Sequence, residues 1–196
     1  MISAIILSAG SSSRMGKHKA LMTIGEKTFL RHIVDVLHSS QITDIVLVLG
    51  YDHQNIRQQL SWFDGKIAVN ENWQQGQLSS ILSGLPLLDR KNLHGVIICP
   101  IDHPLISQTL IVNLLQAFWK SNKKIILPKY KGRRGHPVIF SRELFEELQM
   151  ASPDTGAREV VHRHVHDIYE METGEEGVVN NIDTPEDYQH LILRGQ

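Results

Sequence analysis

Apolar runs of strand length alternate with stretches of helical periodicity along the chain. Uninterrupted apolar runs predict buried strands, and apolar residues three or four positions apart predict helices between them. The predicted strands cover residues 2–7, 45–49, 66–69, 96–99, 124–127 and 137–140. The helical stripes cover residues 29–37, 56–60, 78–85 and 110–118, and further helices are expected to begin near residues 141, 154 and 184.

Strands without polar alternation are typical of parallel sheets covered by helices on both faces. We therefore expect one domain over residues 1–196, built as a three-layer α/β/α sandwich around a mostly parallel, Rossmann-like sheet. In such doubly wound sheets, ligands bind beyond the carboxyl ends of the strands. Four segments that we place just after strands are therefore candidates for a site: 8–19, 70–80, 100–104 and 180–184.

Composition narrows the class of protein. With 20 Lys and Arg against 21 Asp and Glu, the net charge is -1, which argues against a general nucleic-acid surface. The single cysteine, Cys99, excludes an internal disulfide, lies in an apolar run and is expected in the core. No stretch approaches the roughly 18 apolar residues of a membrane span, and the apolar start is too short for a signal peptide. We expect a soluble, cytoplasmic protein that binds neither nucleic acid nor membrane.

The segment after the first strand has the properties of a polyphosphate site. Residues 8–19 read Ser-Ala-Gly-Ser-Ser-Ser-Arg-Met-Gly-Lys-His-Lys. Gly10 and Gly16 allow positive φ and a close approach of the backbone to a ligand. Successive small residues can direct backbone N–H groups into one anion-binding concavity, and the serine hydroxyls add donors. Positive charge comes from Arg14, Lys17 and Lys19.

Two common phosphate loops do not fit this segment. The Walker A pattern needs four residues between its glycines and Ser or Thr after its Lys, whereas five residues separate Gly10 from Gly16, and His18 follows Lys17. The Rossmann fingerprint needs a second glycine where this chain has Ser12. The structural alternative is a solvated strand-to-helix turn that carries cations.

Further motifs follow this loop in a fixed order. They are Leu7 to Gly16 with Lys19-Ala20-Leu21, Asn70 with Trp73, Gly76, Ser79 and Ser80, Pro100 to Pro104, Gly135-His136-Pro137, Asp154 to Arg158, and Asn181 to Asp187. Together they resemble the molybdenum cofactor nucleotidyltransferases of the MobA-like NTP transferase superfamily, over nearly the whole chain. Ala9 before Gly10 is similar to the cytidylyltransferase branch, since the guanylyltransferases carry Leu-Ala-Gly-Gly. Ser8 replaces the usual alanine.

The resemblance implies a nucleotide-diphospho-sugar transferase type of fold and a metal-dependent reaction. CMP would pass from CTP to the terminal phosphate of molybdopterin, a phosphorylated pterin cofactor, with release of pyrophosphate. Asp102 and Asp183 would hold Mg²⁺, which prefers hard oxygen ligands. Arg14 and Lys19, together with Asp102, would be catalytic. The implied nucleotide and acceptor contacts are Leu7, Ala9, Gly10, Ser11, Ser12, Asn70, Gly76, Ser80 and His136.

Each candidate also has a structural interpretation. Asp102 has the position of a cap for the helix expected near Ser107, and Asp183 or Thr184 is a cap type for the last helix. The structural alternative for the stretch 70–80 is an ordinary loop and helix start, with Trp73 as a packing residue. Arg133 and Arg134 read either as contacts for the acceptor phosphate or as a solvated basic loop.

Three neighbouring histidines, His162, His164 and His166, do not form a zinc motif. They lack the usual ligand spacing and an accompanying cysteine, so we expect them on the surface, where a helix gives way to a strand.

Two alternatives to the molybdopterin reaction stay open. One is a nucleotidyltransferase that acts on another phosphorylated metabolite or uses GTP as donor. The other is a non-catalytic protein that delivers the cofactor to a molybdenum hydroxylase apoenzyme. The pair of candidate metal carboxylates favours catalysis, because delivery alone does not require them.

Overall fold

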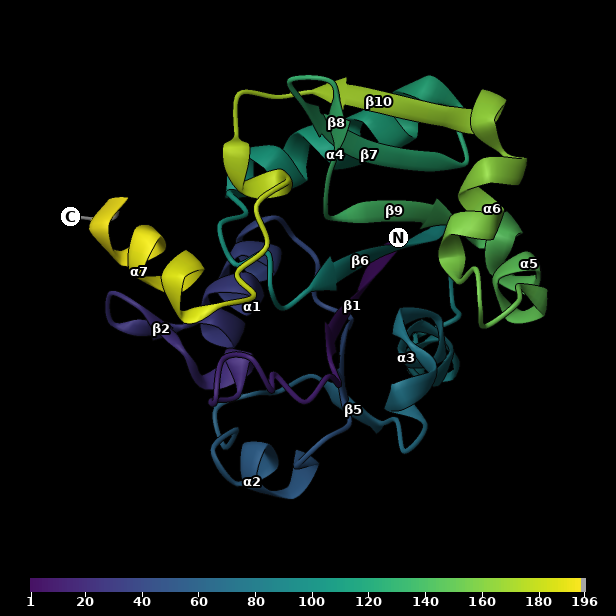
Figure 1. The fold of residues 1–196 in the computed structure, drawn as a ribbon. Coiled ribbons are helices and arrows are strands. Elements are labelled where there is room, and N and C mark those ends of the chain that lie inside the picture. The colour runs from purple at the N-terminus through teal and green to yellow at the C-terminus, as the bar shows by residue number, and fades with distance from the viewer. Residues whose placement is uncertain (195–196) are drawn as a thin grey trace.

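One mixed sheet runs through the middle of the molecule in the computed structural model, which describes residues 1–194 (Figure 1). Its strands are β1 Ile2–Ser8, β4 Ile45–Leu49, β5 Lys66–Val69, β6 Gly95–Pro100, β7 Ile125–Tyr130, β8 Arg133–Arg134, β9 Val138–Ser141 and β10 Ile168–Glu172. Their order is β10-β7-β9-β6-β1-β4-β5, and β8 pairs with β7. All six predicted strands are present, with ends shifted by at most three residues.

Most neighbouring strands run parallel, as the uniform apolar runs predict. Parallel pairs join β1 to β4 and β6, β4 to β5, and β7 to β10. The short strand β8 is antiparallel to β7, and β9 is antiparallel to both β6 and β7. This reversal places the start of β9 at the same edge of the sheet as the end of β6, so His136 comes close to His103.

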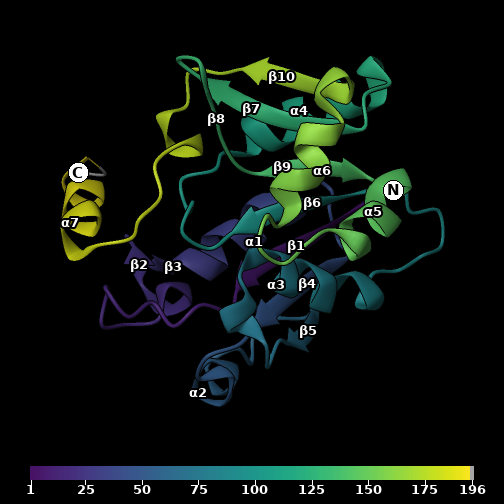
Figure 2. The ribbon, with the colours of Figure 1, turned by 45° about the vertical axis from the view of Figure 1, so that its right-hand side comes forward.

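Helices cover both faces of the sheet, which confirms the three-layer arrangement (Figures 1 and 2). They are α1 Phe29–Ser39, α2 His53–Gln58, α3 Gln77–Gly84, α4 Gln108–Ser121, α5 Phe145–Met150, α6 Ala157–Arg163 and α7 Pro185–Arg194. Alternate residues of β1 belong to separate hydrophobic cores. Ala4 and Ile6 share one core with α1 and α4, while Ile5 and Leu7 share the other with α3, α5 and α6. Both faces of the strand are buried, so its sequence shows no polar alternation.

Short elements complete the chain. The strands β2 Thr23–Ile24 and β3 Lys27–Thr28 form a separate hairpin. Single 3₁₀ turns lie at Lys19–Leu21, Trp73–Gln75, Leu85–Leu87, Arg142–Leu144, Val165–Asp167 and Glu176–Val178.

The segment before Asp183 differs from the prediction, because a loop and not a strand leads into it. Its backbone bonds go to other loops at the edge of the sheet. The Val178 carbonyl accepts the His136 N–H at 2.8 Å, and the Ile182 N–H donates to the Asp102 carbonyl at 2.8 Å. With these groups paired to loop residues, the segment does not join a strand ladder.

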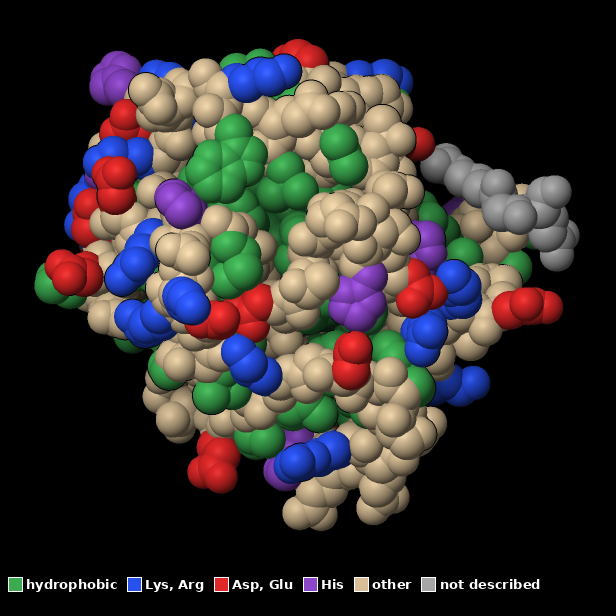
Figure 3. Space-filling model, turned by 180° about the vertical axis from the view of Figure 1, so that it is seen from behind, with side chains coloured by type: hydrophobic (Ala, Val, Ile, Leu, Met, Phe, Trp, Pro, Cys, Tyr) green, Lys and Arg blue, Asp and Glu red, His purple; other side chains and the backbone are tan. Residues whose placement is uncertain are grey.

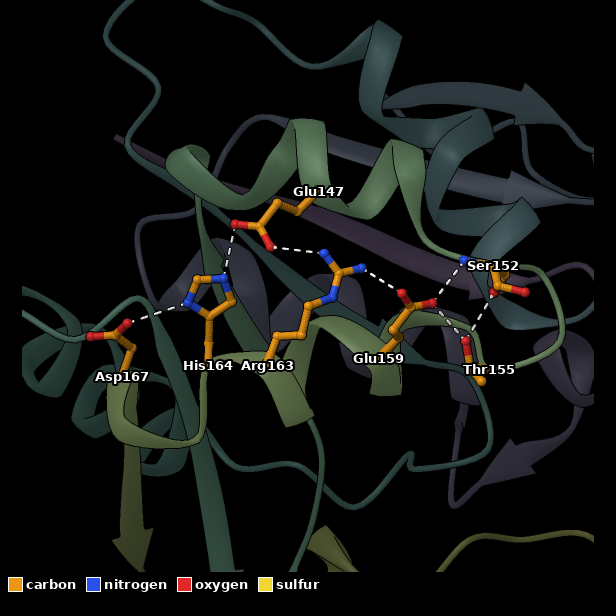
Figure 4. A network of polar contacts seen from close by, with 7 residues as sticks. All are labelled: Glu147, Ser152, Thr155, Glu159, Arg163, His164 and Asp167. Atoms are coloured by element: carbon orange, nitrogen blue, oxygen red, sulfur yellow. Dashed lines mark hydrogen bonds and ion pairs between the residues drawn. The ribbon is translucent and has the colours of Figure 1, made fainter.

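The histidine cluster is only partly exposed. His162 and His166 are exposed as expected, but His164 is half-buried. Its Nε2 lies 2.8 Å from Glu147 on α5, and its Nδ1 lies 3.3 Å from Asp167 (Figure 4). The full network in Figure 4 joins Glu147, Ser152, Thr155, Glu159, Arg163, His164 and Asp167. His164, which follows the last residue of α6, therefore links the end of that helix to α5, and its carboxylate partners compensate for its partial burial.

The surface carries charges of both signs. On the face seen in Figure 3, Lys and Arg side chains are interspersed with Asp and Glu. Within residues 1–194, every helix is too short or too polar to cross a membrane.

Candidate active site

A cavity of about 430 Å³ opens at the carboxyl ends of β1 and β6. Segments far apart in the sequence supply its wall. The lining residues are Leu7, Ser8, Ala9, Gly10, Ser11, Ser12, Ser13, Arg14, Lys19, Trp73, Gln74, Gly76, Gln77, Ser80, Pro100, Ile101, Asp102 and Asp183. The structure therefore brings together every predicted site residue except Asn70 and His136.

Lys19 lies between the two predicted metal carboxylates. Its Nζ is 2.5 Å from Asp183 Oδ1 and 3.9 Å from Asp102 Oδ2, and its side chain is only 10% exposed. Arg14 reaches Asp183 Oδ2 at 3.1 Å from a more exposed position. Two cations and two carboxylates thus converge on one cleft.

The charge state of Asp183 follows from these contacts. Burial raises the pKa of this carboxyl, but the hydrogen bond and charge of Lys19 and the charge of Arg14 outweigh that effect. The pKa therefore lies below its ordinary value. Asp183 is ionised near neutral pH, the state that a metal ligand requires.

The helix caps are supplied by other residues, which leaves both carboxylates to the cleft. Ser107 Oγ accepts the Leu110 N–H at 3.0 Å at the start of α4. Thr184 Oγ1 accepts the Asp187 N–H at 3.2 Å at the start of α7. The capping interpretations of Asp102 and Asp183 are therefore wrong, because Ser107 and Thr184 fill those positions.

The loop after β1, residues 8–19 (the β1 loop), turns at Ser12 and Gly16. Their φ angles are 51° and 65°, whereas Gly10 does not adopt positive φ. The Met15 N–H donates to the Ser12 carbonyl at 2.9 Å, which closes the turn. Of the two glycines that allow positive φ, Gly16 adopts it and Gly10 does not. At Gly10 a side chain would meet open space, so the backbone there is accessible from the cavity.

Asn70 stands behind the cavity wall. It is buried, and its amide nitrogen donates to Ser79 Oγ at 2.9 Å and to Ser80 Oγ at 3.0 Å. Its Oδ1 accepts the Asn72 N–H at 2.9 Å. Because Ser80 lines the cavity, Asn70 orients a lining residue. Contrary to the prediction, the Asn70 side chain itself does not border the cavity.

His136 also lies apart from the cavity. Its ring centroid is 5.0 Å from that of His103, and its Nδ1 is buried with no hydrogen-bond partner among the residues described. Burial, together with the charges of His103 and Arg158, lowers the pKa of His136 to about 4. The ring is therefore neutral near pH 7. The neighbouring Arg133 and Arg134 form the strand β8 and not a loop, and Arg134 pairs with Glu170 at 2.7 Å.

Trp73, Gln74 and Gln77 are among the lining residues that were not predicted to contact a ligand. Trp73 belongs to a recognised motif, but its sequence context fits a packing role equally well. The glutamines lie in a polar turn and a short helix start, and such positions carry no distinctive signal.

Asp102 and Asp183 suit a hard divalent cation such as Mg²⁺. This ion is commonly held by one or two protein carboxylates together with substrate phosphates. Within residues 1–194, no group of three or more His, Cys, Asp or Glu is arranged to hold a metal. The candidate metal ligands at the cleft are therefore the two carboxylates alone. Beside them lie Arg14 and Lys19, whose side chains are of the types that bind phosphate.

Known proteins share this architecture. The model of the MobA-like NTP transferase domain matches residues 4–168. The molybdenum cofactor cytidylyltransferase of Escherichia coli K12 is 28% identical over 95% of this chain and 93% of its own length. Nicotine blue oxidoreductase of Paenarthrobacter nicotinovorans is 24% identical over 97% of this chain and 96% of its own.

A solved structure extends the likeness to three dimensions. Rv0371c of Mycobacterium tuberculosis H37Rv superposes with a TM-score of 0.84 at 25% identity, over 98% of this chain and 97% of that one. That protein has also been solved in complex with manganese. Fold, cleft and relatives define an α/β protein of the nucleotidyltransferase class. The chain belongs to the MobA-like NTP transferase family.

Proposed function

We propose that this protein transfers CMP from CTP to the terminal phosphate of molybdopterin and releases pyrophosphate, in a reaction that depends on Mg²⁺. The observation that carries the proposal is the convergence of Arg14, Lys19, Asp102 and Asp183 on one cavity. Phosphoryl-type transfer needs positioning and charge neutralisation more than a covalent nucleophile, and this cleft offers both.

The β1 loop would receive the triphosphate. Its backbone is accessible at Gly10, and Arg14 and Lys19 supply positive charge at the same wall. An arginine fork suits bidentate phosphate contacts, while a lysine acts as a point charge. As the bond between the α-phosphorus and the oxygen that bridges it to the β-phosphorus breaks, these cations would stabilise the negative charge on the departing pyrophosphate.

The carboxylates would serve the metal. Asp102 and Asp183 would hold Mg²⁺, which when bound neutralises phosphate charge. The two residues are anchored separately, through the carboxyl end of β6 and through the loop before α7, and the Ile182–Asp102 backbone bond ties those segments together. This backbone bond would limit changes in the spacing of the two proposed metal ligands before substrate arrives.

The choice of acceptor and nucleotide rests on sequence likeness. An oxygen of the acceptor's terminal phosphate would attack the α-phosphorus of CTP, and pyrophosphate would leave with its bridging oxygen. Ala9 beside Gly10 supports CTP, and so does the likeness to a molybdenum cofactor cytidylyltransferase. His136 lies apart from the cavity, so an effect of its neutral ring on the acceptor would pass through its neighbour His103, the residue after Asp102 in the chain.

Variants of the cleft test the reaction. We expect Arg14→Ala and Asp102→Ala each to reduce pyrophosphate release from CTP, Mg²⁺ and molybdopterin by about 100-fold or more, because each removes charge stabilisation in the transition state. Lys17→Ala is the matched control, since Lys17 is an exposed cation of the same loop outside the cavity lining. Full turnover in both cleft variants would contradict the proposal.

The same assay separates the alternatives. A cofactor-delivery protein for a molybdenum hydroxylase apoenzyme would release no pyrophosphate with any acceptor. An oxidoreductase like the nicotine blue relative would likewise leave CTP intact. The paired carboxylates and cations favour transfer, because neither delivery nor redox chemistry calls for a triphosphate-binding cleft.

A further inference from the structure

The β1 loop is tied to a second loop by one side-chain pair. His18 Nε2 lies 2.8 Å from Asp52 Oδ2, and both side chains are partly shielded, with exposures of 19% and 30%. Asp52 belongs to the turn between β4 and α2, 34 residues further along the chain. The contact therefore joins the loop that carries Arg14 and Lys19 to a different strand end.

The turn that holds Asp52 is itself built against the β1 loop. The Tyr51 N–H donates to the Ala9 carbonyl at 2.9 Å. The Tyr51 ring lies 5.8 Å from the ring of His18 and 5.8 Å from that of Trp73, which lines the cavity. His18 therefore lies in a row of contacts along one wall of the candidate site.

Asp52 is held in place for this contact. Its backbone is left-handed, with φ 52°, and its Oδ1 accepts the Asn55 amide N–H at 2.6 Å. The hydrogen bonds from Asn55 and then His18 lower the pKa of Asp52 below its ordinary value. One carboxylate oxygen is thus fixed by α2, and the other faces His18.

On the N-terminal side of Lys19 the β1 loop is weakly held, whereas Ala20 on the other side is fully buried in the core. Residues 16 and 17 are exposed, and the Lys19 N–H reaches Ser12 Oγ only at 3.4 Å, within the same loop. His18 immediately precedes Lys19, whose Nζ must meet Asp102 and Asp183. A side-chain anchor at position 18 therefore restricts the backbone from which Lys19 extends.

We infer that His18 and Asp52 form a positioning pair that holds the β1 loop in its phosphate-binding arrangement. The inference rests on the proposed function of that loop as a triphosphate site. Neither residue lines the cavity, so their effect would pass through Lys19 and the loop backbone. Loss of the pair should weaken phosphate binding without removing a phosphate contact.

Binding of inorganic pyrophosphate tests the pair directly, because pyrophosphate probes the phosphate site without base or acceptor. We expect His18→Ala to weaken pyrophosphate binding about tenfold in calorimetry with Mg²⁺ present, as small displacements of positioned groups do. His18→Gln, which can still donate to Asp52, should restore most of the affinity. His53→Ala is the matched control, since His53 is a half-buried neighbour of Asp52 in α2.

Asp52→Gly provides a second route if His18→Ala does not fold, because glycine adopts the left-handed backbone at this position without strain and offers no acceptor to His18. It should weaken pyrophosphate binding, and His18→Ala/Asp52→Gly should be no weaker than His18→Ala alone. Folded His18→Ala and Asp52→Gly proteins that bind pyrophosphate as the wild type does would overturn the inference. If the wild type binds pyrophosphate, the variants bind it less well, and no CMP is transferred, the pair stands and the proposed reaction fails.

Discussion

Lys19 shows how single side chains decide the character of the cleft. An ammonium group this well shielded would be costly without partners, and two carboxylates supply them. Removing one member of such a cluster leaves uncompensated charge, so the residues act as a unit. The same cation that balances the carboxylates in this structure is positioned to meet phosphate.

His136 gives a prediction at the same scale. Its pKa of about 4 in the folded protein lies below the ordinary 6.5, so the unfolded chain binds the proton more readily. Its contribution to stability is complete above pH 6.5 and is lost as the pH falls from 6.5 toward 4. Between these limits the free energy of unfolding should decrease by about 3 kcal/mol on account of this group.

Denaturant unfolding of the wild type and His136→Asn at pH 7 and pH 4 measures this contribution. The wild type should lose more stability than the variant over this range, because asparagine does not titrate. Equal losses in the two proteins would show that His136 is accessible to protons in the folded state.

At the scale of elements, the junction of β4 with the β1 loop sets the shape of the cavity. A Cβ built on Gly50 would lie 2.6 Å from the Ala9 carbonyl oxygen and 2.9 Å from Trp73 Cβ. Ala9 and Trp73 both line the cavity. Only glycine lets these three segments meet without displacement.

Gly50→Ala should therefore both destabilise the protein and disturb the site. We expect the free energy of unfolding to fall by about 1–3 kcal/mol, as overpacking does elsewhere, and CTP binding to weaken. Gly174→Ala is the control, because a Cβ at Gly174 would meet no atom within 4 Å. Unchanged stability in Gly50→Ala would mean that the two loops separate easily.

Elements with strong local patterns could be predicted from the sequence, and elements defined by distant contacts could not. The buried strands, α1 and α4 follow from uninterrupted apolar runs and helical stripes. The direction of β9 has no local signal, since Val138–Ser141 is as apolar as a parallel strand. The loop into Asp183 is likewise fixed by bonds to residues far away in the sequence, such as Asp102.

The residues of the candidate site likewise fall into those that the sequence could predict and those that it could not. Arg14, Lys19, Asp102 and Asp183 could be recognised because their motifs are specific, and the structure brings them together. The packing of Asn70 against Ser80 and the contact of His18 with Asp52 depend on how loops meet. Such contacts join positions with no shared sequence pattern, so sequence reasoning does not find them.

At the scale of the whole molecule, the central sheet, with a hydrophobic core on each face, brings the candidate site residues together at the carboxyl ends of β1 and β6. The ends of β1 and β6, the start of α3 and the loop before α7 reach the cavity from different parts of the chain. Family membership and fold establish the class of this protein. The choice of nucleotide and acceptor would depend on a few residues that line the cavity.

Transfer of labelled nucleotide to molybdopterin tests this account most directly. The wild-type protein would be incubated with Mg²⁺, molybdopterin and α-labelled CTP, GTP, ATP or UTP in parallel, with Asp102→Ala as the inactive control. The account predicts label on the pterin product from CTP, with one pyrophosphate released for each CMP transferred. Transfer from GTP in preference to CTP would contradict the cytidine assignment, and no transfer from any nucleotide would contradict the proposed reaction.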